Sequence, residues 1–287
     1  MFGEIILDTL IDSIKLLPFL FFSYLLIEYI EHKASEKIRG ALASSGKYGA
    51  LAGALLGSIP QCGFSVTAAN LYSGRVISIG TLVAVFLATS DEAIPVLISN
   101  PQSVSKILPI ILIKMVIGII FGFLIDLLFI RKINKKEHDK KEDEHMHGVC
   151  DNCDCEHGIL KSTLHHTVNV FLFILVVAFL LNLIITLIGE ENLSKVLLNG
   201  TIFQPLLAGI IGLIPNCASS VVLTQLYIEG SISFGSIIAG LSAGSGLGLV
   251  VLFKENKDIK ENFKIMGGVY LIGVTVGIIF DLLGVVI

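Results

Sequence analysis

Two copies of one short motif place an amide and a thiol directly after a proline. The copies read Ile-Pro-Gln-Cys at 59–62 and Ile-Pro-Asn-Cys at 214–217. Proline removes a backbone hydrogen bond from a helix and frees the carbonyl group that would have accepted it. Freed carbonyls and amide oxygens are ligands for a cation, and thiols are ligands for a soft one. The alternative is a proline kink in which the cysteines only fill space. The candidate ligands are Gln61, Cys62, Asn216 and Cys217.

A second polar group, Thr-Ser-Asp-Glu at 89–92, lies within an otherwise apolar stretch. Each carboxylate in a membrane-spanning helix costs about 2.5–3.5 kcal/mol on insertion scales, so such residues usually face a cavity and mark an ion path. We expect Ser90, Asp91 and Glu92 to contribute to the ion site, and Asp91 more directly than Glu92, because neighbouring side chains diverge around a helix. The matching residues of the second half include Ser245 but no acid. The alternative is a helix end at residue 91 that exposes both acids to water.

Two further pairs of polar residues occupy matching positions in the two halves of the chain. Asn70 and Gln225 each follow the break in their half, and either line the same cavity or form hydrogen bonds between helices. Asp126 and Asp281 each follow a Gly-x3-Gly pattern, which is typical of close helix packing. Because these acids lie near the ends of their segments, a cap or a salt bridge is favoured over a role in transport.

The hydrophilic segment 131–161 carries a dense run of metal-ligating side chains. Thiolates together with imidazoles suit zinc, copper or a thiophilic metalloid. The spacing matches no defined zinc fold, so two interpretations remain open: a segment that captures or senses metal, or a charged spacer whose ligands are incidental. The candidate ligands are His145, His147, Cys150, Cys153, Cys155 and His157.

The composition indicates that a membrane surrounds these residues. The chain has 287 residues, of which 54% are hydrophobic and 15% are charged, against roughly 25% charged in a soluble domain. The mean hydropathy is +0.85. A net charge of −4 argues against a nucleic-acid partner. The first apolar segment has no basic region before it and no small-residue cleavage site after it, so we expect a retained helix and not a signal peptide.

The two apolar blocks, 1–130 and 162–287, are related by one ungapped offset of 155 residues, and the linker 131–161 separates them. The offset aligns Pro60 with Pro215 and Cys62 with Cys217. It also aligns Tyr72 with Tyr227 and Asp126 with Asp281. Chance matching of Leu and Ile does not explain aligned Pro, Cys, Tyr and Asp. We therefore predict an internal repeat.

Each block is predicted to form five helical segments, giving an all-α polytopic membrane protein of about ten segments. An odd number of segments inverts the second repeat relative to the first, a common transporter design in which broken helices mark the substrate site near the midplane. The pieces that meet at Pro60 and Pro215 are short for the roughly 20 residues of a full crossing, so broken and re-entrant helices both remain open. The segments are about 14–30, 48–60, 62–74, 79–99 and 105–130, then about 166–188, 202–215, 217–228, 234–252 and 265–287.

The basic residues predict the orientation. Most of the 20 Lys and Arg residues fall in 31–47, 74–78, 131–165 and 253–264, which lie on one side if the N-terminus is outside. The positive-inside rule makes that side cytoplasmic. We therefore expect a multi-pass protein of the plasma membrane with both termini outside and the linker in the cytoplasm.

These motifs resemble those of the ten-helix heavy-metal exporters, a family that also includes proteins described as ArsP-like arsenic efflux proteins or manganese transporters. The resemblance covers nearly the whole chain except the linker. It implies a ten-segment fold and the export of a metal or metalloid. Manganese prefers oxygen ligands and trivalent arsenic prefers thiols, so the resemblance leaves the substrate open. The residues that carry it are 59–65, 70–72, 80–81, 89–92, 214–220 and 244–248.

The function predicted from these features is that of a secondary transporter and not an enzyme. The chain has no Walker-type phosphate-binding motif, so we expect no ATPase of its own. We also expect no cofactor, apart from a metal ion that is transported or bound by the linker. Coupling to protons through Asp91 or Glu92 is the natural companion hypothesis. Two alternatives remain: a transporter of an organic or anionic solute, and a membrane-bound metal sensor that acts through the His/Cys linker.

Overall fold

The computed structural model is all-helical over the residues that it describes. These are 14, 17–18, 21–22, 24–25, 46–59, 61–90, 93–99, 104–136, 163–164, 167–176, 179–180 and 203–285, with only the backbone described at 46–47, 95, 99, 129–136 and 217. The principal helices are α3 (Gly46–Gly57), α4 (Cys62–Ser73), α5 (Ile79–Ala88), α6 (Ala93–Ser99), α7 (Val104–Lys136), α10 (Gln204–Gly212), α11 (Cys217–Ile228), α12 (Phe234–Ala243), α13 (Leu247–Glu255) and α14 (Ile259–Leu282).

Two of the predicted helices are each divided into two. The predicted continuous helix 79–99 was wrong: α5 ends at Ala88 and α6 begins at Ala93, close to the helix end at residue 91 that the sequence left open as the alternative. The predicted helix 234–252 is likewise interrupted between α12 and α13, where Gly246 adopts a φ of 52°. The physical reason in the second case is that glycine adopts positive φ without steric cost. In addition, α7 continues to Lys136, past the expected boundary at 130, and α14 begins at Ile259 instead of 265.

Helices end before each of the two Pro-Cys motifs and begin again at its cysteine. Helix α3 ends at Gly57 and α4 begins at Cys62, while α10 ends at Gly212 and α11 begins at Cys217. Pro215 lies in the second of these connections. Pro60 lies outside the described residues.

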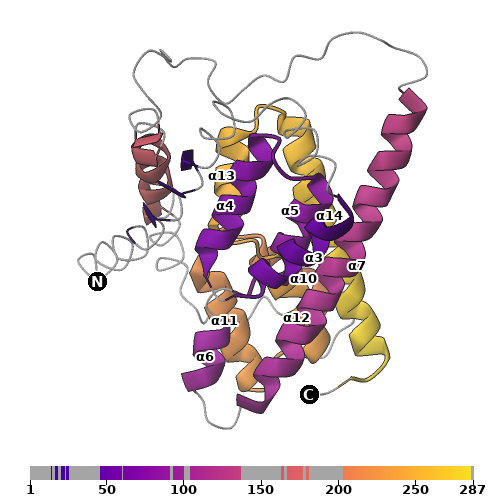
Figure 1. Ribbon diagram of the computed structural model, residues 1–287. Coiled ribbons are helices and arrows are strands. Elements are labelled where there is room, and N and C mark those ends of the chain that lie inside the picture. The colour runs from indigo at the N-terminus through magenta and orange to yellow at the C-terminus, as the bar shows by residue number, and fades with distance from the viewer. Residues whose placement is uncertain are drawn as a thin grey trace, which may run out of the picture.

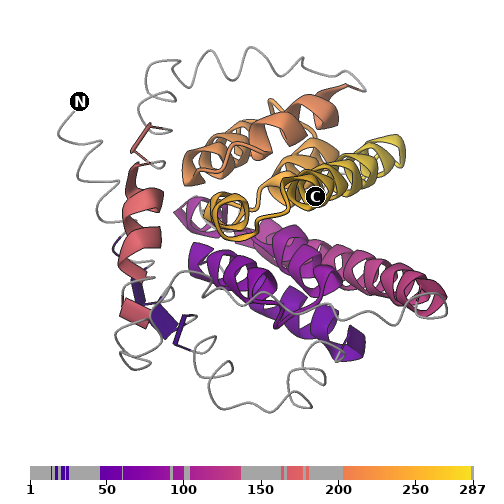
Figure 2. The same cartoon turned by 90° about the horizontal axis from the view of Figure 1, so that it is seen from above.

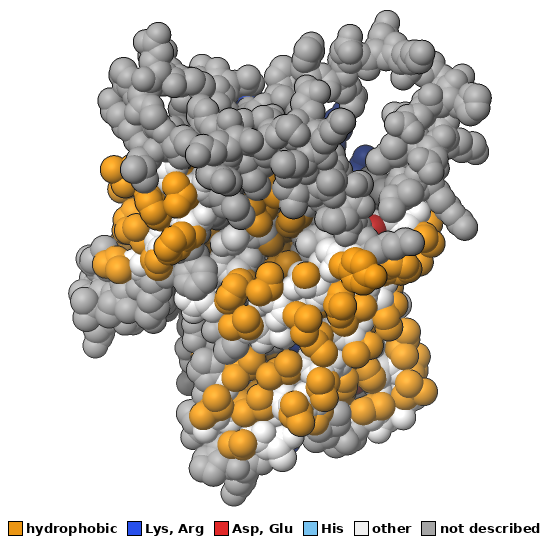
Figure 3. Space-filling model, in the orientation of Figure 1, with side chains coloured by type: hydrophobic (Ala, Val, Ile, Leu, Met, Phe, Trp, Pro, Cys, Tyr) orange, Lys and Arg blue, Asp and Glu red, His pale blue; other side chains and the backbone are white. Residues whose placement is uncertain are grey.

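Three described stretches are long and apolar enough to cross a membrane. They are Val104–Leu128, Phe234–Glu255 and Ile259–Leu282. The first is only 28% buried and the second is 89% buried, so α7 lies at the periphery whereas α12 and α13 lie in the centre. Side chains along α7, among them Leu108 at 64% exposed and Ile120 at 55%, face outward. Hydrophobic side chains cover most of the described part of the face in Figure 3, as lipid contact requires.

The helices of the two halves pack in matching arrangements. Helix α5 lies between α3 and α7, and α12 lies between α10 and α14. The halves exchange contacts, because α4 packs on α13 and α11 packs on α6. Helices α7 and α14 run in opposite directions (Figure 1). The helical residues 167–176 lie along one edge of the bundle when it is seen from above (Figure 2).

Glycines allow the backbones of these helices to touch. A Cβ atom at Gly80 of α5 would lie 2.2 Å from the carbonyl oxygen of Gly122 of α7. A Cβ atom at Gly235 of α12 would lie 2.1 Å from the carbonyl oxygen of Gly277 of α14. The Gly-x3-Gly pattern therefore serves the close packing that the sequence predicts.

Asp126 and Asp281 cap neighbouring helices, as predicted. The carboxylate of Asp126, which is 4% exposed, accepts from Ser78 Oγ and from the Gly80 N–H, both at 2.8 Å. Asp281 accepts from Ser233 Oγ at 2.8 Å and from the Gly235 N–H at 3.0 Å. Each acid thus satisfies orphan donors at the N-terminus of α5 or α12 and complements the helix dipole there.

We expect Asp126→Ala to lower the free energy of unfolding by about 1–3 kcal/mol, because it leaves two buried donors without their acceptor. Asp126→Asn should cost less, since its amide oxygen still accepts from Gly80. Thermal unfolding of the purified protein in detergent measures both, with the exposed Glu229→Ala as a control. An Asp126→Ala protein as stable as the wild type would contradict the cap.

Candidate functional site

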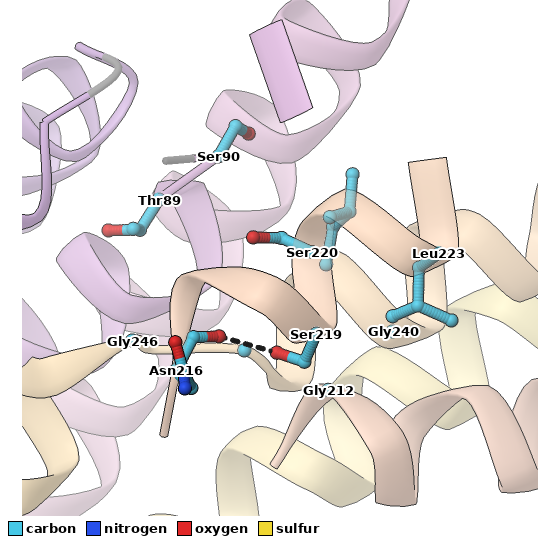
Figure 4. Close-up of a pocket in the computed structure, with 11 residues that line it drawn as sticks. Thr89, Ser90, Gly212, Asn216, Ser219, Ser220, Leu223, Gly240 and Gly246 are labelled. Carbon is cyan, nitrogen blue, oxygen red and sulfur yellow. Dashed lines mark hydrogen bonds between the residues drawn. The ribbon is translucent and has the colours of Figure 1, made fainter. Parts of the chain in front are cut away.

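A small polar cavity lies where the ends of several helices meet. Its volume is about 10 Å³, which is close to the space that one water molecule occupies. Side chains and backbone from both halves surround it, as Figure 4 shows. The lining residues are Thr89, Ser90, Gly212, Asn216, Ser219, Ser220, Leu223, Gly240, Leu241, Gly244 and Gly246.

Asn216 begins helix α11 at one wall of the cavity. Its Oδ1 accepts from the Ala218 N–H at 3.2 Å, so the side chain caps the helix whose positive end faces the cavity. The Ser219 hydroxyl donates to the carbonyl oxygen of Asn216 at 2.7 Å, which holds this turn (Figure 4). The amide predicted as a ligand therefore lines the cavity, with its oxygen engaged in the cap.

The opposite wall is the end of helix α5. Thr89 is the residue after the last helical turn, and its hydroxyl donates to the carbonyl oxygen of Val85 at 2.7 Å. The carbonyl oxygen of Ser90 accepts from the Ala93 N–H at 3.1 Å, where α6 begins. Ser90 lines the cavity and is 2% exposed. Asp91 and Glu92 lie outside the described residues.

Ser245 occupies the matching connection between α12 and α13. Its carbonyl oxygen accepts from the Gly248 N–H at 3.2 Å, as that of Ser90 does for Ala93. The hydroxyls of Ser245 and Ser242 are fully buried and have no hydrogen-bond partner among the described residues. A buried hydroxyl without a partner is costly, so both have unused capacity for a ligand.

Four other residues that the sequence singled out, Gln61, Cys62, Asn70 and Gln225, are not among the residues that line this cavity. Gln61 precedes α4 and makes no side-chain cap, and Cys62 is half-buried and packs against the hydrophobic core. Asn70 accepts from the Tyr24 hydroxyl at 3.3 Å, which is the hydrogen bond between helices that the sequence left open. Gln225 is exposed and donates to Glu229 at 2.9 Å. The side chain of Cys217 lies outside the described residues.

Lys114 is a cation that the sequence reasoning did not assign to the site. Its side chain is fully buried in the middle of α7. The ammonium group donates to the carbonyl oxygen of Thr89 and, at 2.7 Å, to that of Leu241. Both acceptors line the cavity, so the lysine joins the end of α5 to the end of α12. The available signal was a single lysine within the apolar run 107–130.

The predicted linker ligands His145, His147, Cys150, Cys153, Cys155 and His157 lie outside the described residues. Within the described part of the chain, no group of three or more His, Cys, Asp or Glu side chains is placed to hold a metal. The polar groups that the described site offers are hydroxyl, amide and carbonyl oxygens, which are hard ligands.

Comparison with known proteins gives one match. A family model described as "Putative, 10TM heavy-metal exporter" matches residues 3–190 and, in a second alignment, residues 166–285. Neither the curated proteins nor the solved structures contain a match.

Gly246 forms the floor of the cavity in a conformation that other residues rarely adopt. Its φ of 52° and ψ of −142° occupy a region that is essentially restricted to glycine. The turn directs the chain from α12 into α13 and brings the Ser245 carbonyl to the start of α13. The shape of this wall therefore depends on a backbone that a side chain would strain.

We expect Gly246→Ala to lower the free energy of unfolding by about 1–3 kcal/mol through this strain. Gly268→Ala is the unstrained control: a Cβ atom there meets nothing within 4 Å, and alanine inside helix α14 should raise the stability by up to about 1 kcal/mol. Thermal unfolding of the two purified variants makes the comparison. A Gly246→Ala protein as stable as the wild type would show that the turn at residue 246 relaxes without cost.

Proposed function

This chain belongs to the family of 10TM heavy-metal exporters, which are multi-pass membrane proteins, and we propose that it exports a metal cation through the cavity between its two halves. The observation that carries the proposal is the chemistry of that cavity. Its walls offer hydroxyls from Thr89, Ser90, Ser219 and Ser220 and the amide of Asn216. Oxygen ligands of this kind suit manganese and similar divalent cations.

The size of the cavity supports an ion over an organic solute. Pockets for small organic ligands occupy about 300–1,000 Å³, whereas this cavity has about 10 Å³. A single dehydrated ion is compatible with that space once the surrounding turns adjust. Asp91 and Glu92 follow Ser90 directly in the chain, and in our proposal they supply the negative charge for the cation and a route for coupled protons.

We infer that the halves 1–130 and 162–287 are inverted repeats joined by the linker 131–161. The support is that equivalent contacts recur at an offset of 155 residues, as the Asp126 and Asp281 caps do. The opposite directions of α7 and α14 agree with inversion. On this basis, the connections at Pro60 and Pro215 are the paired helix breaks of a transporter site.

The proposed orientation places both termini outside and the linker in the cytoplasm. Two contacts at opposite ends of the bundle are consistent with it. Arg75 forms an ion pair with Glu261 at 3.4 Å, and the sequence assigns both to the cytoplasmic side. Lys106, which the sequence leaves for the other side or the membrane, stacks over the ring of Tyr227 at 4.5 Å.

We expect expression in a metal-sensitive bacterium to lower the cellular manganese content, and Asp91→Asn to restore it to the level of cells without the protein, because the cation loses its negative partner. Elemental analysis across manganese, zinc, cobalt, arsenite and a methylated arsenical makes the measurement. Asp258→Asn is the matched control, since Asp258 is exposed and caps α14 by accepting from the backbone N–H groups of Lys260 and Glu261. Asparagine caps helices equally well. Asp91→Asn cells that still exclude the metal at equal expression would refute this role for Asp91.

The double variant Cys62→Ser, Cys217→Ser decides between hard and soft cargo. We expect manganese efflux from this variant to match the wild type, because oxygens and not thiols would bind the ion. The same cells provide the test with arsenite, a thiophilic species. If the double variant loses both manganese efflux and arsenite efflux, the thiols bind the cargo, and this would contradict an oxygen-lined site.

A further inference from the structure

The buried ammonium group of Lys114 occupies a position built from two helix ends. Thr89 follows the last residue of α5, and Leu241 lies in the last turn of α12. The last carbonyl groups of a helix lack intrahelical donors and carry the negative end of its dipole. Two such ends, one from each half of the chain, meet at the Lys114 nitrogen. Their combined partial charge forms a cation-binding position.

This position is part of the wall of the cavity. Thr89 and Leu241 are both lining residues, and the Lys114 side chain is fully buried. Bringing a lysine into such an interior costs desolvation energy, which only good partners offset. Carbonyl oxygens of this kind are also the ligands that a metal cation would take at the same place. The protein thus places its own cation where the cargo would find oxygen ligands.

The lysine is present in one half only. The position in α14 that corresponds to Lys114 is Val269, which is buried. The acids Asp91 and Glu92 are likewise found in the first half alone, and they follow Thr89 closely in the chain. The buried cation therefore binds the carbonyl group of Thr89, two residues before the first of these acids in the chain.

We propose that the Lys114 ammonium is a tethered cation that fills the position between the carboxyl ends of α5 and α12 when the carrier is empty, and that the exported cation displaces it. This inference rests on the proposed function, since it assumes a cationic cargo. In the empty carrier, the lysine keeps both carbonyl groups paired. In the loaded carrier, the metal and the ammonium repel each other, and the ammonium leaves the carbonyls.

An anionic cargo predicts the opposite effect of the lysine. A buried ammonium would then attract the cargo, and removing it would weaken binding. Whether neutralising Lys114 strengthens or weakens the binding of the cargo therefore distinguishes a cation from an anion. A purely structural bridge predicts no tightening of cation binding.

The test is Mn²⁺ binding to the purified full-length protein in lipid nanodiscs, followed by the paramagnetic resonance signal of free Mn²⁺. We expect Lys114→Met to bind Mn²⁺ about tenfold more tightly than the wild type, because it removes a nearby like charge while keeping the bulk of the side chain. Lys114→Arg, which keeps the charge, should not bind more tightly. Lys106→Met is the matched control, because it removes the same charge from the same helix at a position over the ring of Tyr227.

Mn²⁺ binding to Lys114→Met that is unchanged, weaker or absent would overturn the proposal. Binding of arsenate or inorganic phosphate that is lost in Lys114→Met would also overturn it, in favour of an anion site. If Lys114→Met does not yield folded protein, Lys114→Gln is judged by the same criterion. Metal export by vesicles that contain the wild-type protein is measured separately. Export by the wild type without tighter Mn²⁺ binding by Lys114→Met refutes only the proposal that the lysine is displaced. Tighter binding without export by the wild type refutes the proposed function alone.

Discussion

The structure depends on the satisfaction of backbone groups at helix ends that lie within an apolar interior. A continuous spanning helix satisfies its own backbone, whereas a broken one exposes donors and acceptors that lipid cannot satisfy. The described helices meet this constraint with side chains from neighbouring helices. Asp126 and Asp281 satisfy the N-terminal ends of α5 and α12, and Lys114 satisfies carbonyl groups at their other ends. The two buried charged side chains among the described residues, Lys114 and Asp126, therefore both bind backbone groups at helix ends.

Close packing makes these cross-helix contacts geometrically feasible. An aspartate has a short side chain, so α7 must approach α5 to within backbone contact before Asp126 reaches the Gly80 N–H. The paired glycines, Gly80 with Gly122 and Gly235 with Gly277, provide that approach. The glycines and the acids are thus one device, and the sequence displays them together as Gly-x3-Gly-x3-Asp. These glycines and acids hold α5 against α7 and α12 against α14, so that the carboxyl ends of α5 and α12 meet at the cavity.

Much of this arrangement could be predicted from the sequence, and the two failures have separate causes. The start of α11 at Cys217 and the capping role of the two aspartates follow from proline chemistry and from spacing, which are written in residue types. The division of 79–99 into α5 and α6 was considered only as an alternative. Pro95, in the first turn of α6, was the available signal, because it has no N–H to donate to the carbonyl group of residue 91 in a continuous helix. The role of Lys114 was missed because its partners are backbone carbonyls. Every residue has a carbonyl group, so no side-chain pattern marks the two that bind the lysine.

The two halves match in their packing contacts but differ in their charged residues. The caps and glycine contacts recur, so each half has its own set of packing contacts. Lys114 matches Val269 and Arg75 matches Gly230, so neither the Lys114 bridge nor the Arg75–Glu261 ion pair recurs at the matching position. At one end of the bundle, the contact is the Arg75–Glu261 ion pair, and at the other it is Lys106 over Tyr227. Ion pairs weaken with salt when they are exposed, whereas a cation over an aromatic ring depends more on local desolvation. The two contacts between the halves are therefore of different kinds, and we expect salt to weaken the Arg75–Glu261 pair more than the contact of Lys106 with Tyr227.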